Sequence, residues 1–153
     1  MSVIAEIEAI RLLIARTASL LDDEDFESWV ALFADDGTYE MSAYSTEIRR
    51  WMTWQLSDKS TLASMLGDVK EHVRDQAKRR HVMGFPQVEV DGAVATATAA
   101  FSLFRTSPEG QTSLYMVGSY EDRLVKSGDT WWYREHKVII DTRMLDMFTH
   151  VPV

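Results

Sequence analysis

The sequence predicts an α+β fold, a cone-shaped domain in which a curved, mostly antiparallel β-sheet wraps around about three helices from the N-terminal half. Apolar residues recur at helical spacing in segments before residue 75, whereas alternating strand patterns and tight turns fill residues 80–142. The length of 153 residues is enough for one hydrophobic core and too short for two, so we expect a single domain over residues 1–153.

The first predicted helix begins after Ser2, a favourable N-cap residue, and carries one apolar stripe at helical spacing. The stripe contains Ile7, Ile10, Ile14, Ala18 and Leu21. The acidic run from Asp22 to Asp25 suits the start of a second helix, Phe26–Phe33, where negative charge is favourable. A calcium site is the weaker interpretation, because this run has neither alternating ligand spacing nor a glycine.

The stretch Trp29–Met41 predicts a corner between the second helix and the first strand. One helical face carries Trp29, Leu32 and Phe33. Asp35-Asp36-Gly37 then ends the helix, since glycine tolerates a tight turn and aspartate competes for backbone hydrogen bonds. Strand alternation resumes at Thr38–Tyr44. The corner therefore joins a bulky apolar helix end to a strand that can carry polar groups inward.

A hairpin tip at Ser45-Thr46-Glu47 leads into a second strand, Ile48–Leu56, for which a short helix is the alternative. The third helix is capped within Asp58 to Ser60, and its stripe contains Leu62, Met65, Leu66, Val69 and Val73. The positive charges at its end suit the helix macrodipole, and they are Lys70, Arg74, Lys78, Arg79 and Arg80. A phosphate-binding patch is the alternative interpretation, which the net charge of −8 disfavours.

The second half of the chain predicts a meander of long antiparallel strands at Arg80–Val90, Ala93–Arg105, Thr112–Lys126 and Thr130–Thr142. The first of these strands is interrupted at Gly84 and Pro86, as in an edge strand or a bulge. Asp91-Gly92 is a strong hairpin signal. Small residues on one face of the next strand leave room for a close helix or a cavity, and they are Ala93, Ala95, Ala97 and Ala99.

The composition is that of an ordinary globular protein, with 46% hydrophobic and 26% charged residues. A net charge of −8 argues against nucleic-acid binding. The apolar runs are far shorter than the roughly 18 residues of a membrane span, and the N-terminus lacks a basic leader, so we expect no membrane contact and a cytoplasmic location. Because the chain has no cysteine, disulfides, thiolate nucleophiles and zinc–thiolate sites are excluded.

The segment Val117–Val153 combines a Gly-x-Tyr-x-Asp-x-hydrophobic strand, a turn, a charged strand ending in Asp, and a tail ending in Pro and an aliphatic residue. These residues are Gly118, Tyr120, Asp122, Leu124, Asp141, Pro152 and Val153. Arg79–Gly92 adds an Arg-His-hydrophobic strand after the third helix. With the Ala-Asp-Asp-Gly corner, this series resembles the small (β) subunits of aromatic-ring-hydroxylating dioxygenases, within the cone superfamily of nuclear transport factor 2-like and SnoaL-like domains. The likeness covers nearly the whole chain.

The resemblance implies a non-catalytic structural subunit of an α3β3 hexamer, with β–β contacts and a larger α subunit that acts on an aromatic compound, such as an aromatic carboxylate. That family needs a Rieske [2Fe–2S] cluster held by two Cys and two His, and a mononuclear Fe(II) held by two His and a carboxylate. This chain has no Cys, and no closely spaced helical pair occurs among its histidines, His72, His81, His136 and His150. The resemblance therefore implies no cofactor and no metal in this chain, and both iron centres in the α subunit.

Two other classes of function stay open: a stand-alone isomerase or dehydratase of the same cone type, and a small-ligand-binding module. A dehydratase needs converging His, Asp and Tyr side chains, and the candidates are Asp36, Tyr39, His81 and His136. In an isomerase the position of the base is taken by Met41, while Glu40 faces the other way. Hydrogen-bonded structural roles are the preferred interpretation of these candidates, because a shifted pKa cannot be read from a sequence.

Contacts with other subunits are expected at two places. Trp131 and Trp132 are adjacent on a strand, so one indole lies inside and the other is a contact anchor on the outer face. The apolar C-terminal tail includes Phe148, Pro152 and Val153, and docking on a neighbouring subunit would cover it. The alternative is that the tail folds back over its own sheet.

Overall fold

The computed structural model describes residues 2–69, 75–145 and 151–153. In chain order the elements are α1 (Val3–Asp22), α2 (Phe26–Val30), β1 (Phe33–Ser45), β2 (Arg50–Asp58), α3 (Lys59–Gly67), β3 (Lys78–Met83), β4 (Gln87–Asp91), β5 (Val94–Thr106), β6 (Thr112–Ser127) and β7 (Thr130–Ile140). The three helices thus lie in the N-terminal half and the meander in the C-terminal half, which confirms the predicted α+β fold.

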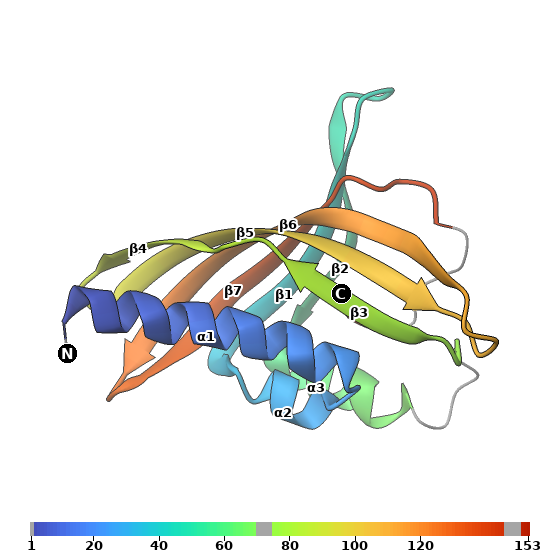
Figure 1. The fold of residues 1–153 in the computed structure, drawn as a ribbon. Helices are drawn as coiled ribbons and strands as arrows, with labels where there is room; N and C mark the ends of the chain where they lie inside the picture. Colours follow the sequence, from blue (N-terminus) through green and yellow to red (C-terminus); the bar gives the residue numbers. More distant parts are fainter. Residues whose placement is uncertain (1, 70–74, 146–150) are drawn as a thin grey trace.

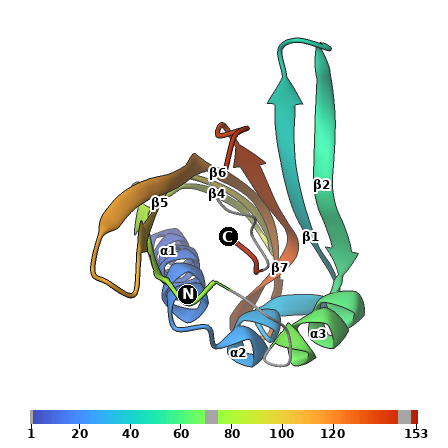
Figure 2. The ribbon, with the colours of Figure 1, turned by 90° about the vertical axis from the view of Figure 1, so that its right-hand side faces the viewer.

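The strands form one seven-stranded sheet in the order β2-β1-β7-β6-β5-β3, and β4 pairs with β5 beyond the end of β3. All pairs are antiparallel except β1 with β7, which is parallel. Seen end-on, the sheet curls around an interior, α1 lies across its open side, and α2 and α3 lie at the lower edge (Figure 2). The predicted curved, mostly antiparallel sheet is therefore confirmed.

Helix starts and buried stripes follow the sequence patterns. The side chains of Ser2, Asp25 and Asp58 each accept a hydrogen bond from the backbone N–H three residues later. The predicted stripe of α1 is buried from Ile10 to Leu21, and Ile7 is half-buried. This stripe faces the concave side of the sheet, where α1 packs against β3, β4 and β7. The acidic run therefore supplies the N-cap of α2, as predicted. Its first residue, Asp22, instead contacts His81 on β3.

The predicted end of the second helix was wrong. α2 ends at Val30 and β1 already begins at Phe33, because the N–H of Tyr133 on β7 donates to the carbonyl of Leu32 at 3.0 Å. Asp35-Asp36-Gly37 does not end a helix but forms an irregularity within β1, where the register with β7 shifts. Gly37 is needed for close approach, since an added Cβ would lie 2.7 Å from the carbonyl oxygen of Tyr133.

The other strands match the predictions apart from their ends. β2 is a strand and not a helix, and it begins two residues later than predicted. The predicted strand Arg80–Val90 is divided into β3 and β4 at Gly84 and Pro86, and both parts pair with β5. Of the alanines predicted to share a face, Ala95, Ala97 and Ala99 are buried. Ala93 is exposed, because β5 begins after it.

The third helix is shorter than its apolar stripe suggested. α3 ends at Gly67, and Val69 is buried just beyond it. The predicted members Val73, Lys70 and Arg74 lie outside the described residues. In the part of the chain that the structure describes, no helix combines the length and the apolar character needed to cross a membrane.

A substitution at Gly118 tests the close contact between β6 and β7. A Cβ at this position would lie 2.1 Å from the carbonyl oxygen of Ile139 and 3.0 Å from the Phe101 ring. Because two paired strands would have to move apart, we expect Gly118→Ala to lower the free energy of unfolding by about 1–3 kcal/mol or more, measured by urea denaturation.

The matched control is Gly67→Ala at the end of α3. An added Cβ there meets no atom within 4 Å, so this substitution should leave stability unchanged or raise it by up to about 1 kcal/mol. Equal effects of the two substitutions would contradict the packing of β6 on β7.

Candidate functional site

A histidine–aspartate pair lies at the centre of the cone. His136 on β7 is directly opposite Asp122 on β6, and its Nδ1 lies 2.6 Å from the Asp122 Oδ1. Both side chains are completely buried. Burial raises the pKa of the Asp122 carboxyl, and the adjacent His136 opposes that rise. The pair therefore places a polar, titratable group at a position that strand alternation directs into the core.

Aromatic rings surround the His136 imidazole. The ring centroids of Tyr120 and Tyr133 lie 4.6 and 4.7 Å from it, and that of Tyr39 lies 5.8 Å away. Trp29 packs edge-on at 6.4 Å. Burial raises the pKa of all three tyrosine hydroxyls, so they are neutral at physiological pH.

A second pair joins α1 to the sheet. Asp22, the last residue of α1, accepts the backbone N–H of His81 at 3.0 Å with each carboxylate oxygen, and its Oδ1 lies 2.6 Å from the His81 Nδ1. His81 lies on β3 and is buried. Because Asp22 accepts from the backbone as a carboxylate, the shared proton belongs on Nδ1 of His81. This contact positions the end of α1 and leaves Nε2 of the imidazole without a hydrogen-bond partner.

Several buried polar atoms in the described residues have no hydrogen-bond partner. They are Nε1 of Trp29, Nε2 of His81, the hydroxyl of Tyr120, Oδ2 of Asp122 and Nε2 of His136. By contrast, the hydroxyl of Tyr133 lies 2.8 Å from that of Thr17, which satisfies it. Each unpaired buried polar group lowers the stability of the fold by about 1–3 kcal/mol, so this cluster is destabilising as it stands.

The end of the chain occupies the interior beside these groups. Val153 is completely buried and Pro152 is buried, and the C-terminus lies within the ring of sheet and helices (Figure 2). The N–H of Val153 donates to the Tyr39 hydroxyl at 3.3 Å. The expectation that Pro152 and Val153 dock on a neighbouring subunit is therefore corrected, because both residues are buried inside the cone of their own chain. Phe148 lies outside the described residues.

Two cavities lie on either side of this tail. The larger, of about 670 Å³, is lined mainly by apolar side chains, including Met41, Trp54 and Leu62. The smaller, of about 260 Å³, is bordered by Asp22 and His81. Val151 and Pro152 line both cavities, so the tail separates them.

The structure buries three of the four predicted acid/base candidates, and it brings two of them, Tyr39 and His136, into ring contact. Tyr39, His81 and His136 lie in the interior, whereas the Asp36 carboxylate is largely exposed and pairs with Arg134 on the surface. The prediction that Asp36 converges with the other candidates was wrong, because its side chain lies on the surface at the irregularity in β1.

The sequence analysis did not identify the two carboxylates that pair with the interior histidines, Asp22 with His81 and Asp122 with His136. Asp22 was interpreted only as part of a capping run. Asp122 was available from strand alternation, since it shares the inward face of β6 with Tyr120 and Leu124. A charged residue between two inward apolar positions is the signal that would have identified it.

The adjacent tryptophans point to opposite faces, as predicted. Trp131 is 3% exposed and donates from Nε1 to Glu6 at 2.6 Å. Hydrogen bonds from Lys126 and Trp131 hold the pKa of the Glu6 carboxyl below its ordinary value. Trp131 therefore packs within its own chain. Trp132 is half-buried on the other face, so part of its side chain is accessible to a partner.

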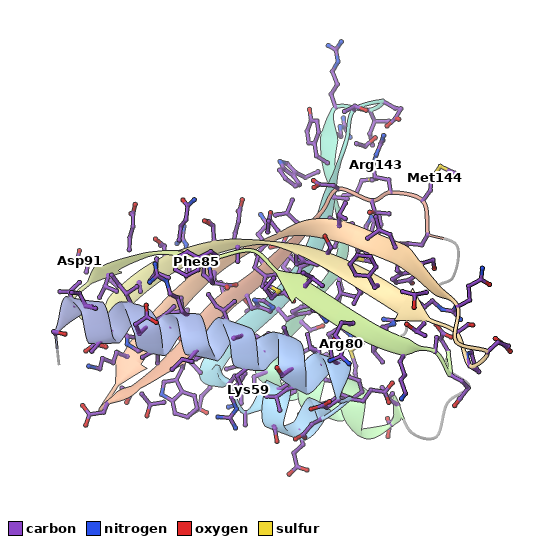
Figure 3. All side chains as sticks on the ribbon, viewed as in Figure 1. Lys59, Arg80, Phe85, Asp91, Arg143 and Met144 are labelled. Atoms are coloured by element: carbon purple, nitrogen blue, oxygen red, sulfur yellow. The ribbon has the colours of Figure 1, made fainter. Side chains whose placement is uncertain are left out.

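The hairpin of β1 and β2, here called the arm, projects away from the cone (Figures 1 and 2). On it Tyr44 and Trp51 are 43% and 56% exposed, and their rings stack edge-to-face at 5.5 Å. Arg143, beyond β7, pairs with Glu47 at the tip of the arm, and its side chain lies beside the arm in Figure 3. β2 is also an edge strand of the sheet. The arm therefore combines exposed aromatic surface with an open sheet edge.

Metal ligands do not cluster in the described part of the chain. There, no three His, Asp or Glu side chains are close enough to hold an ion, and the whole sequence has no Cys. The Asp22–His81 and Asp122–His136 pairs are thus separate two-residue units.

Comparison with known proteins gives consistent likenesses. Residues 2–137 match the family model of the SnoaL-like domain. The chain is 32% identical to the β subunit of 2-aminobenzenesulfonate 2,3-dioxygenase from Alcaligenes sp., over 89% of this chain and 91% of that protein. It is 28% identical to the hydroxylase β subunit of methanesulfonate monooxygenase from Methylosulfonomonas methylovora, over 95% of this chain and 86% of that protein. A crystal structure described as an aromatic-ring-hydroxylating dioxygenase β subunit from Novosphingobium aromaticivorans has a TM-score of 0.81 and 28% identity, covering 92% of this chain and 94% of that one.

The hydroxyls of Tyr133 and Tyr120 provide a matched test of the interior. Tyr133→Phe removes a hydrogen bond with Thr17 and should lower the free energy of unfolding by about 1 kcal/mol. Tyr120→Phe removes a hydroxyl that has no partner, so stability should stay the same or rise. Urea denaturation of both variants measures the difference, and a larger loss for Tyr120→Phe would show that its hydroxyl is satisfied.

The ion pair of Asp75 with Arg105 should make the stability of the fold depend on pH in the acid range. It lies at the smaller cavity, and two hydrogen bonds of 2.7 Å from Arg105 lower its pKa to about 2. A carboxyl with a folded-state pKa below its unfolded value of about 3.9 stabilises the fold above pH 4 and loses that contribution as the pH falls to about 2.

We therefore expect Asp75→Asn to lower the free energy of unfolding at pH 7 by about 1–3 kcal/mol, and the difference from the natural chain to disappear near pH 2. Thermal unfolding across this range provides the measurement, with the exposed Asp129→Asn as control. A difference that stays constant down to pH 2 would exclude the ion pair as its cause.

Proposed function

Because the chain belongs to the SnoaL-like domain family and, within it, to the β subunits of ring-hydroxylating oxygenases, we propose that it is a non-catalytic structural subunit supporting an iron-bearing α subunit. The observation that carries this proposal is the match to a dioxygenase β subunit along almost the entire chain. The assembly would act in the cytoplasm, with this chain contributing one domain.

The described residues of this chain do not fit the iron centres of such an oxygenase. A Rieske cluster needs two thiolates, and the sequence has no Cys. A mononuclear iron needs two His and a carboxylate at one point, and the described residues contain no such group. Each interior histidine instead has its Nδ1 engaged by an aspartate. In this proposal we therefore assign both the cluster and the mononuclear iron to the α subunit.

Exposed surface supports assembly with other subunits. The arm carries Tyr44 and Trp51, which have few neighbours to cover them and which are the side chains that anchor protein interfaces. Trp132 adds a half-buried indole on the outer face of β7. We place contacts of an α3β3 hexamer, both with the α subunit and between β subunits, on these surfaces.

The relatives suggest the kind of substrate that the complete oxygenase takes. Their names refer to an aromatic sulfonate and to methanesulfonate, and a more distant structural neighbour is a benzoate dioxygenase β subunit. We therefore propose an aromatic compound with an acid group, either carboxylate or sulfonate.

Assembly on the arm can be tested by co-expression with large oxygenase subunits from the same organism. We expect a coloured complex whose light-scattering mass corresponds to three copies of each subunit. Trp51→Glu should weaken assembly at least tenfold, because an interface anchor is worth about 2 kcal/mol or more.

Phe85→Glu is the control, since Phe85 is 77% exposed and lies away from the arm (Figure 3). Normal assembly of the Trp51→Glu variant would exclude the arm as a contact. If the natural chain forms no complex with a large subunit, the structural role itself is wrong.

A further inference from the structure

We infer that the arm recognises an acidic segment of the large subunit, which it binds through the exposed arginines at its tip and through Trp51. This inference rests on the proposed structural role and deepens it, because it names the chemistry of the partner surface. It starts from the distribution of charge. The whole chain has a net charge of −8, whereas the tip of the arm is basic.

Two neighbouring arginines at the tip carry uncompensated positive charge. Arg49 and Arg50 are exposed, and neither has an ion-pair partner within residues 2–69, 75–145 and 151–153. The nearby carboxylate of Glu47 is already engaged, because hydrogen bonds from Arg143, its own backbone N–H and Ser45 lower its pKa to about 2. The tip therefore offers guanidinium groups without a counter-charge, and carboxylates are the partners that guanidinium groups bind best.

The backbone of Arg49 supports a function for its side chain. Its φ is +54°, in the left-handed region that is unfavourable for a residue with a long side chain. Glycine is the usual residue in this conformation, and it occupies two other turns of the chain, at Gly92 and Gly128, with φ of +60° and +61°. A strained backbone conformation of this kind is typical of a functional position.

The aromatic part of the arm is ordered beside these charges. Trp51 packs edge-to-face with Tyr44 at 5.5 Å, and the amine of Lys137 on β7 lies over the Trp51 ring, 5.3 Å from its centroid. The ion pair of Arg143 with Glu47 ties the tip to the segment after β7, and Arg143 lies beside the arm in Figure 3. An anchor that is already ordered loses less entropy on binding, and tryptophan with arginine is typical of binding hot spots.

The apolar surface around the arginines favours a protein partner over a free anion. Tyr44, Ile48 and Trp51 are all exposed on the arm, and a small anion would leave them uncovered. Nucleic acid is disfavoured, because a net charge of −8 repels its phosphates. The partner surface should therefore combine carboxylates with an apolar recess for the indole of Trp51.

Another copy of this chain does not supply that surface in a closed assembly. Its acidic run, residues 22–25, lies at the junction of α1 and α2, at the opposite end of the molecule from the arm (Figures 1 and 2). Complementary surfaces at opposite ends join copies into an open filament, whereas a ring needs a rotation that closes on the first copy. In the proposed three-fold assembly the acidic segment therefore comes from the large subunit.

The test is dilution of the purified complex with its large subunit, followed by light scattering at about 50 and about 500 mM salt. We expect the dissociation constant of the natural complex to rise at least about tenfold between these conditions, because salt screens the contact between opposite charges. The double variant Arg49→Glu/Arg50→Glu should bind at least about tenfold more weakly at low salt and lose most of the salt dependence.

Arg80→Glu/Arg123→Glu is the matched control, because it changes the net charge equally at exposed arginines of β3 and β6, outside the arm. Its dissociation constant should stay within about threefold of the natural value. Arg49→Gly removes the charge and the backbone strain together. It should weaken the complex about threefold or more, while the urea midpoint of the free chain stays the same or rises. The urea midpoint of every variant shows that it is folded.

Three results would overturn the acidic partner. These are a natural dissociation constant for Arg49→Glu/Arg50→Glu, an equal loss in the control pair, and salt-sensitive self-association of the chain alone that the arm variant abolishes. The last would assign the arm to the acidic run of another copy. If Trp51→Glu prevents assembly and the arginine variants do not, the structural role stands and this inference alone fails. A natural chain that forms no complex with a large subunit overturns both.

Discussion

The parallel pairing of β1 with β7 is the contact on which the rest of the cone depends. It joins the helical N-terminal half to the antiparallel meander, and it is the single parallel pair among the described strands. It requires a glycine at position 37, because the carbonyl of Tyr133 leaves no space for a side chain. It also sets Tyr39 beside His136 and so brings an N-terminal aromatic residue to the central histidine.

The same pairing explains why the arm projects. β7 ends at Ile140, which is the partner of Ala43, so the last residues of β1 pair with β2 alone. A two-stranded hairpin without a covering layer cannot bury both faces, and Tyr44 and Trp51 are exposed as a result. Surface that is costly for an isolated chain is expected where another subunit docks.

The interior combines features that a purely structural subunit does not need. Pairing each histidine with an aspartate limits the cost of burying them, but both Nε2 atoms remain unsatisfied. A core built only for stability would place apolar side chains there, since these pack as well without a desolvation penalty. Departures of this kind are usual at sites that bind something.

The sequence by itself determined the fold class, the helix caps, the stripe of α1 and the strand breaks at Gly84 and Pro86, because these depend on local spacing and backbone chemistry. Alternation also determined that Trp131 and Trp132 face opposite ways. The tertiary structure decided where α2 ends, since a hydrogen bond from β7 captures the chain at Leu32. It also decided that Asp36 faces outward, that Asp22 and Asp122 face the histidines, and that Val153 fills its own cone. These outcomes depend on contacts between residues far apart in the chain, and no local pattern encodes which distant partner a carboxylate or a tail will meet.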